Sequence, residues 1–303
     1  MPTGIVLPLD PSAANVVDFA ISQARKAFDA GVRQIWLAQQ FDVDAIALAG
    51  LIGAAVPGLA VGTSVVPINP RHPLLVASAA QTAQAATHGN FTLGVGLGSH
   101  TIEHRAFGTV WTDPVGRLRE HLTVLRAIFD DGAVDFHGDA FSAAPEWSVR
   151  VPGGTPVPIY VAAMGPKALQ VTGELADGTL PFLAGPRTVG EYIVPTIVKA
   201  AAGRPDPRVV AMVPAQVATD VDAAREAATE RLAFYEAIPS YQKVIAREQV
   251  SNVTELAAIG SAAQVRATLQ RYLDAGAADV ALSPLSATPE DLAELWDVVA
   301  TLR

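Results

Sequence analysis

The segment VPIYVAAMGPKAL, residues 157–169, is an apolar run followed by a glycine, a proline and a lysine and then by Ala-Leu. The β-branched and aromatic residues at its start are typical of a buried strand. Gly165 follows that strand, and Pro166 stands where a helix would begin, because proline sacrifices no helical hydrogen bond in the first turn. The segment therefore predicts a strand, a tight turn and a helix in succession, the repeating unit of an α/β fold.

Three other segments show the same arrangement of an apolar run followed by a polar or glycine-rich cluster. They are IWLA (35–38) before Gln39-Gln40, LAVGT (59–63) before Ser64-Val65, and FTLGVGLG (91–98) before Ser99-His100. Helix-like stretches separate them, so the polar chemistry is placed at the exits of successive parallel strands. That placement predicts a (β/α)₈ barrel, whose site is built from the loops at the carboxyl ends of the strands.

Eight such units fit within the 303 residues, and no linker or break in composition divides them, so one domain over 1–303 is expected. Insertions are expected at 132–154, with a possible hairpin, and at 239–251. Helices are expected at 12–30 with Ser12 as the cap, 44–55, 72–87, 113–129, 167–175, 187–202, 220–238, 262–275 and 289–302. The expected strands are Gly4–Leu7, Arg33–Ala38, Leu59–Val66, Phe91–Leu97, Val157–Ala162, Gly178–Phe182, Val209–Val217 and Asp279–Ser283.

Composition excludes several classes of function. A net charge of −9 argues against nucleic acid as a partner. The absence of cysteine excludes disulfides, a thiolate nucleophile and a cysteine-based zinc site. Because only 17% of the residues are charged, part of the surface is expected to be covered by another subunit. The first residues lack the pattern of a signal peptide, and a reducing, cytoplasmic setting is expected.

The stretch from Ala45 to Pro70 carries no charged residue and is long enough to cross a bilayer. Pro57-Gly58 divides it, however, and the part that follows has the β-branched content of a buried strand. We therefore expect a buried helix and a central strand here, and no membrane span.

Residues 163–167 allow two interpretations. Unpaired amides and the positive end of the helix dipole favour an anion, especially phosphate, and Lys167 would add charge. An ordinary turn between a strand and a helix is equally rich in glycine and proline, so the residues alone leave both readings open.

The segment GVGLGSH (94–100) carries Gly94, Gly96 and Gly98 but places Ser99 where a dinucleotide fingerprint needs glycine or alanine. The better explanation is steric, because glycine lets a flat ring or another backbone approach closely. The next residues, HTIEH (100–104), match a zinc-hydrolase pattern for which Glu174 is a conceivable third ligand. We expect a loop rather than a helix at this strand exit, and therefore no metal site.

Together, four segments resemble the luciferase-like flavin and deazaflavin oxidoreductase family over almost the whole chain. They are VGTSVVPINPRHPLLVASAAQTA (61–83), TLGVGLGSH (92–100), VPIYVAAMGPKALQVTGELADGTLPF (157–182) and IGSAAQVRATLQRYLDAGAADVALSP (259–284). Arg71-His72-Pro73 and the turn at 162–167 look most like the branch that uses coenzyme F420, an FMN-like 5-deazaflavin with an acidic tail.

The resemblance implies a cofactor that lies across the strand ends. Ser64-Val65 match a bulge with a non-prolyl cis peptide behind the ring, and Gly98, Ser99 and His100 match ligands after the fourth strand. The phosphate cradle corresponds to Ala163, Met164, Gly165, Pro166 and Lys167.

Gln39-Gln40 depart from the family, because several relatives carry an Asp-His pair at this position. Two amides can hydrogen-bond a ring edge but cannot supply a proton near neutral pH. His72 and His100 then become the candidate catalytic residues.

The expected function is an F420-dependent oxidoreductase that transfers a hydride to or from a small organic substrate. Two alternatives stay open: an FMN-dependent luciferase-like monooxygenase, and an F420-binding carrier protein with little turnover. A homodimer through the second and third helices, 44–55 and 72–87, is also expected, because both are apolar or small nearly all round.

Overall fold

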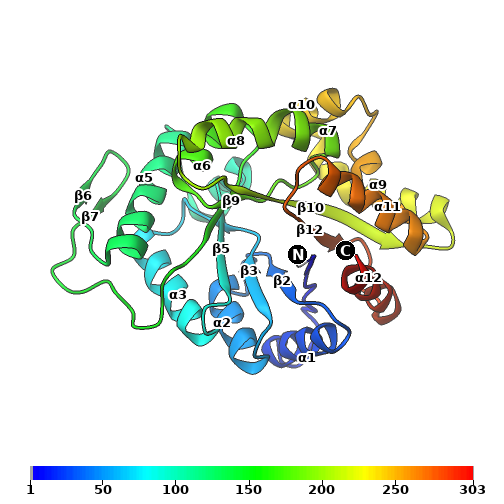
Figure 1. Ribbon diagram of the computed structural model, residues 1–303, viewed down its shortest axis with the longest axis horizontal. Helices are drawn as coiled ribbons and strands as arrows, with labels where there is room; N and C mark the ends of the chain where they lie inside the picture. Colours follow the sequence, from blue (N-terminus) through cyan, green and yellow to red (C-terminus); the bar gives the residue numbers. More distant parts are fainter. Residues whose placement is uncertain (1–2, 303) are drawn as a thin grey trace.

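The computed structural model describes residues 3–302 and shows a closed barrel of parallel strands with helices around it (Figure 1). β9 pairs with β10, β10 with β12 and β12 with β1, so the sheet closes on itself and the predicted (β/α)₈ barrel is confirmed. β3 and β4 occupy one strand position, which makes eight in the ring. The ring strands are β1 (Gly4–Val6), β2 (Gln34–Leu37), β3 (Ala60–Thr63), β4 (Val66–Pro67), β5 (Phe91–Gly96), β8 (Ile159–Ala162), β9 (Gly178–Thr179), β10 (Arg208–Val217) and β12 (Asp279–Pro284).

The helices follow the predicted order with additions in the loops. Segments of π-helix, Ala127–Asp131 and Val189–Ile193, extend α5 and join α7 to α8. The helices are α1 (Val16–Asp29), α2 (Ala45–Ala55), α3 (Pro73–Ala86), α4 (His100–Phe107), α5 (Pro114–Arg126), α6 (Pro166–Leu175), α7 (Pro186–Thr188), α8 (Val194–Ala201), α9 (Val221–Glu236), α10 (Pro239–Glu248), α11 (Ala262–Asp274) and α12 (Pro289–Thr301).

The first helix begins later than predicted. Asn15 is its cap, with its side-chain oxygen accepting from the amides of Val17 and Asp18, while Ser12 bonds Asp10 within a turn. Both residue types cap helices well, so the sequence alone did not separate them.

Both insertions contain regular structure. The first holds the expected hairpin of β6 (Phe136–His137) and β7 (Ser142–Ala143), which lies at the left edge of Figure 1 beyond α5. The second, predicted at 239–251, holds α10. Beyond it lie a 3₁₀ helix, Val253–Leu256, and a strand absent from the prediction, β11 (Ala258–Gly260), which pairs with β10 outside the ring.

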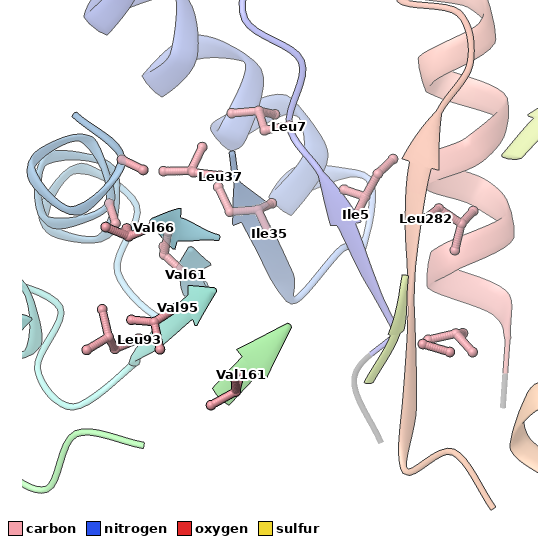
Figure 2. Packing of buried hydrophobic residues seen from close by; sticks show 14 of the residues in the cluster. Ile5, Leu7, Ile35, Leu37, Val61, Val66, Leu93, Val95, Val161 and Leu282 are labelled. Atoms are coloured by element: carbon pink, nitrogen blue, oxygen red, sulfur yellow. The ribbon is translucent and has the colours of Figure 1, made fainter. Parts of the chain in front are cut away.

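Side chains alternate along the strands between the two faces of the sheet, and each face packs into its own apolar cluster. Ile35, Leu93 and Leu282 belong to the large cluster between the sheet and its helices, part of which Figure 2 shows. Trp36 and Tyr160 belong to a second cluster, and their ring centroids lie 6.2 Å apart. Because successive side chains of a strand point to opposite faces, this second cluster fills the barrel interior.

The uncharged stretch from residue 45 to 70 forms α2 and β3, as predicted. Within residues 3–302, none of the helices combines the length and the apolar character needed to cross a bilayer.

Candidate active site

The four polar clusters found in the sequence lie on one rim of the barrel. They follow β2, β3, β5 and β8, which are consecutive neighbours in the parallel sheet. Parallel strands end on the same side, so residues 39–40, 64–65, 98–100 and 163–167 meet at the carboxyl end.

Ser64 and Val65 interrupt the predicted third strand and divide it into β3 and β4. The peptide bond between them is cis, which is the geometry that the family resemblance implied. The Ser64 amide donates to the Leu37 carbonyl at 2.8 Å. Its hydroxyl is buried and has no hydrogen-bond partner among the described residues.

The glycines of β5 permit a close approach between strands. The Thr63 hydroxyl donates to the Gly94 carbonyl at 2.8 Å and accepts from the Gly94 amide at 2.9 Å. A Cβ added at Gly96 would lie 2.7 Å from a methyl carbon of Val65. These two glycines are therefore explained by the neighbouring β3–β4 segment.

The floor of the site is apolar. Val6, Val65 and Phe182 are half-buried and pack against the Trp36 cluster inside the barrel. Val65 and Phe182 follow the carboxyl ends of β3 and β9, so this floor lies at the rim.

The start of α6 leaves backbone donors unpaired within the helix. Gly165 is its N-cap without a side-chain bond, and Pro166 is the first helical residue. The first helical amide bond runs from Leu169 to the Gly165 carbonyl at 2.9 Å, so the amides of Lys167 and Ala168 have no partner in the helix. Among the described residues, apart from its immediate chain neighbours, none has an atom within 4 Å of where a Cβ at Gly165 would stand. This open, uncapped terminus, with Lys167 exposed beside it, fits a phosphate group.

The prediction of a loop at HTIEH was wrong, because residues 100–107 form α4. The His100 and His104 rings stack with centroids 6.1 Å apart, and His100 meets the Trp111 ring edge-on at 5.5 Å. Glu103 points inward, away from solvent, and Glu174 pairs with Arg119 at 2.5 Å. Among residues 3–302, no three His, Cys, Asp or Glu side chains are grouped to hold a metal ion.

Glu103 is the buried anchor of α4 and was singled out in the sequence only as part of a zinc pattern. Its Oε2 accepts from Asn69 Nδ2 at 2.8 Å and from Trp111 Nε1 at 3.2 Å. Its Oε1 has no partner in the described chain and occupies the space that a side chain at Gly98, where φ is +76°, would need. Burial raises the pKa of Glu103, and the bonds from Asn69 and Trp111 oppose that rise.

His72 serves as the cap of α3. Its Nδ1 accepts from the Leu74 amide at 3.2 Å, and its Nε2 lies 3.0 Å from the Ser142 carbonyl of the hairpin. Both ring nitrogens are therefore engaged with main chain, which leaves no nitrogen of His72 free for a substrate.

The side chain of Gln39 is also engaged in local structure. Its amide nitrogen donates to the Val43 carbonyl at 2.9 Å, and its oxygen accepts from the Ala45 amide and from Arg71, both at 3.1 Å. Gln40 is exposed at the same rim. Gln39 thus fastens the loop after β2 to the start of α2.

Comparison with known proteins identifies similarities over most of the chain. The family model described as luciferase-like monooxygenase matches residues 1–294. A 5,10-methylenetetrahydromethanopterin reductase of Archaeoglobus fulgidus is 34% identical over 171 residues, which cover 55% of this chain and only about half, 51%, of the reductase. An F420-dependent glucose-6-phosphate dehydrogenase of Beutenbergia cavernae is 29% identical over 233 residues, covering 74% of this chain and 67% of the dehydrogenase.

A solved structure resembles the whole barrel. An F420-dependent secondary alcohol dehydrogenase in complex with an F420-acetone adduct has a TM-score of 0.78 at 20% identity, covering 100% of this chain and 98% of its own. At this identity the likeness concerns the fold.

Proposed function

The chain belongs to the luciferase-like monooxygenase family, and on that premise we propose that it is a coenzyme F420-dependent oxidoreductase acting on a small organic substrate. The observation that carries the proposal is the uncapped start of α6 on the same rim as the cis Ser64-Val65 peptide. A tricyclic, phosphorylated cofactor requires both an anion site and a flat apolar floor, and the rim offers the two together.

Each part of the rim has an assigned role. The amides and side chains of Ala163 to Lys167 would hold the phosphate, and Ser64, Val65, Gly98 and Ser99 would surround the ring, with Gln39 and Gln40 near its edge. F420 supplies hydride transfer when bound. These residues would fix which face of the ring meets the substrate and would keep water away from it.

His100 is the proton donor that we assign, since His72 has both ring nitrogens bonded to main chain. His100 is exposed at the start of α4, and Trp111 meets its ring from the side. An imidazole is the side chain that most often serves as a general acid or base in enzymes.

Titration with F420 and FMN side by side tests the proposal. We expect a saturable change in the visible absorption of F420, and weaker binding of FMN. Bleaching or recovery of the F420 band on addition of an alcohol or ketone distinguishes an enzyme from a carrier. Tighter binding of FMN would instead support the monooxygenase alternative, which the family description also favours.

Replacing Lys167 by alanine is expected to weaken F420 binding about tenfold, because a charge-assisted bond to phosphate contributes roughly 1.5 kcal/mol. Lys167→Arg should retain most of the affinity. Lys199→Ala, on the outer helix α8, is the matched control and should leave the dissociation constant unchanged. Equal affinity in the alanine variant and the wild type would remove Lys167 from the cradle.

We also propose a homodimer through α2 and α3, which pack side by side (Figure 1). Leu51 and Leu75 are 50% and 70% exposed on these two helices, although both are large apolar residues. The double variant Leu51→Asp, Leu75→Asp is expected to sediment as a monomer at micromolar concentration. Val198→Asp, on α8, should remain dimeric, and a monomeric wild type would refute the proposal.

The lack of cysteine supports a reducing, cytoplasmic setting.

A further inference from the structure

An exposed apolar lip lies beside the proposed cofactor site. Phe41 and Phe107 are 73% and 51% exposed, and their ring centroids lie 5.7 Å apart. Phe41 belongs to the loop after β2, and Phe107 ends α4, which starts at His100. The helix therefore runs along the rim from the exit of β5 to the exit of β2. Ile102 and Val110, from the same α4 region, are exposed as well.

The two segments that form this lip carry little positive charge. Residues 39–44 hold Asp42 and Asp44 and no cation, and residues 100–111 hold Arg105 as their only lysine or arginine. Arg71, which reaches this loop, is already paired with Asp44 at 2.8 Å and with Gln39 at 3.1 Å. Arg105 is the one strongly basic side chain of these two segments and stands against Asp42 and Asp44, so an anionic substrate would meet more carboxylates than guanidinium groups here.

The opposite side of the site is aromatic. Phe182, at the floor, contacts Tyr235 with ring centroids 5.1 Å apart, and Tyr235 contacts Tyr241 at the same separation. Burial raises the pKa of Tyr235, which keeps its phenol uncharged. The floor, the aromatic wall of Phe182, Tyr235 and Tyr241, and the Phe41–Phe107 lip are thus uncharged, and their segments all follow ring strands at the same rim.

From this surface we propose that the substrate of the rim site is uncharged and largely apolar, such as an aliphatic ketone or secondary alcohol, and that its chain lies against Phe41 and Phe107. The inference rests on the proposed function for the location of the chemistry. It adds the class of substrate, and it gives the exposed rings an occupant that removes them from water.

Displacement of a neutral dye tests the class of substrate without cofactor. Nile red bound to the protein is displaced with 2-alkanones from four to ten carbons and, separately, with glucose 6-phosphate. We expect the half-displacing concentration to fall roughly twofold to fourfold for each added methylene, the upper figure corresponding to about 0.8 kcal/mol for full burial. Glucose 6-phosphate should displace nothing. A flat series, or stronger displacement by the sugar phosphate, overturns the proposal.

The double variant Phe41→Ala, Phe107→Ala locates the site. It should bind the ten-carbon ketone about tenfold more weakly and bind F420 within twofold of the wild type. Trp147→Ala removes a still more exposed ring, 83% exposed, from the loop after the hairpin and should change neither affinity. An unchanged ketone series in the double variant overturns the proposal. Conversion of the double variant from dimer to monomer also overturns it, because Phe41 and Phe107 would then form a contact between subunits. Failure of F420 binding with an intact ketone series would contradict the cofactor assignment alone.

Discussion

Replacing His121 by leucine is expected to remove much of the acid sensitivity of this protein and to raise its stability at neutral pH. His121 lies on α5 and is fully buried, and neither ring nitrogen has a hydrogen-bond partner within residues 3–302. The His121 and Phe141 rings pack edge to face, with their centroids 5.7 Å apart. A buried polar group without partners costs about 1–3 kcal/mol, so an apolar replacement of similar size should stabilise the fold by roughly 1 kcal/mol.

The free energy of unfolding depends on pH because the folded protein disfavours the charged form of His121. Burial, together with the nearby charges of Arg117 and His72, lowers the pKa of His121 from 6.5 to about 3. Between these values the unfolded chain binds a proton that the folded chain does not, so the free energy of unfolding falls as the pH falls. The full contribution is present above pH 6.5, and about 3 kcal/mol of it is lost by pH 4.

Urea unfolding at pH 7.5, 5.5 and 4.5 measures this effect. From pH 7.5 to 4.5 the unfolding free energy of the leucine variant should fall markedly less than that of the wild type. Only titratable groups other than His121 then contribute to the loss. His137→Leu, at an exposed position in the hairpin, is the control and should keep the wild-type slope. If the unfolding free energies of the wild type and His121→Leu fell in parallel with pH, buried His121 would not be the cause of the acid sensitivity.

Gly94→Ala is expected to cost about 3 kcal/mol or more of folding stability, at the upper end of what overpacking costs. The added Cβ would lie 1.8 Å from the Thr63 carbonyl oxygen and 2.8 Å from a methyl carbon of Leu180, and the Thr63 backbone, held in β3, cannot move aside. The paired bonds between Thr63 and Gly94 would break as well. Thermal unfolding and soluble yield measure the loss.

Gly96→Ala is the matched variant two residues later in the same strand. Its Cβ would meet a methyl of Val65, a side chain that can rotate, at 2.7 Å. It should therefore fold with a loss below about 1.5 kcal/mol while shifting Val65 and weakening F420 binding. Equal stability of the two alanine variants would show that the β3–β5 contact does not require Gly94.

The barrel could be predicted because its strands carry dense β-branched sequence and end in glycine or polar clusters, which are local signals. α4 could not, because every residue of it except Glu103 is solvent-facing or partly so, and its inward residue is a carboxylic acid. β11 is only three residues long and pairs with a strand more than 40 residues earlier in the chain, so no local pattern marks it.

The rim itself followed from the order of the strands, whereas the roles of single side chains did not. His72 and Gln39 both carry groups suited to a site, and the structure uses both to hold loops and helix ends. Contacts of Glu103 with Asn69 and Trp111 join α4 to the loops after β4 and after α4, and no spacing in the sequence encodes such a meeting.

Pairing of β9 with β10 has a consequence for how this protein behaves in concentrated solution. A ring has neither a first nor a last strand, so the barrel strands present no row of unpaired backbone groups to another chain. Among residues 3–302, open edges are confined to three-residue β11 and the two-residue strands of the hairpin, which are too short to template fibril growth. Closure thus lets the strands be almost wholly apolar without making them sites of aggregation.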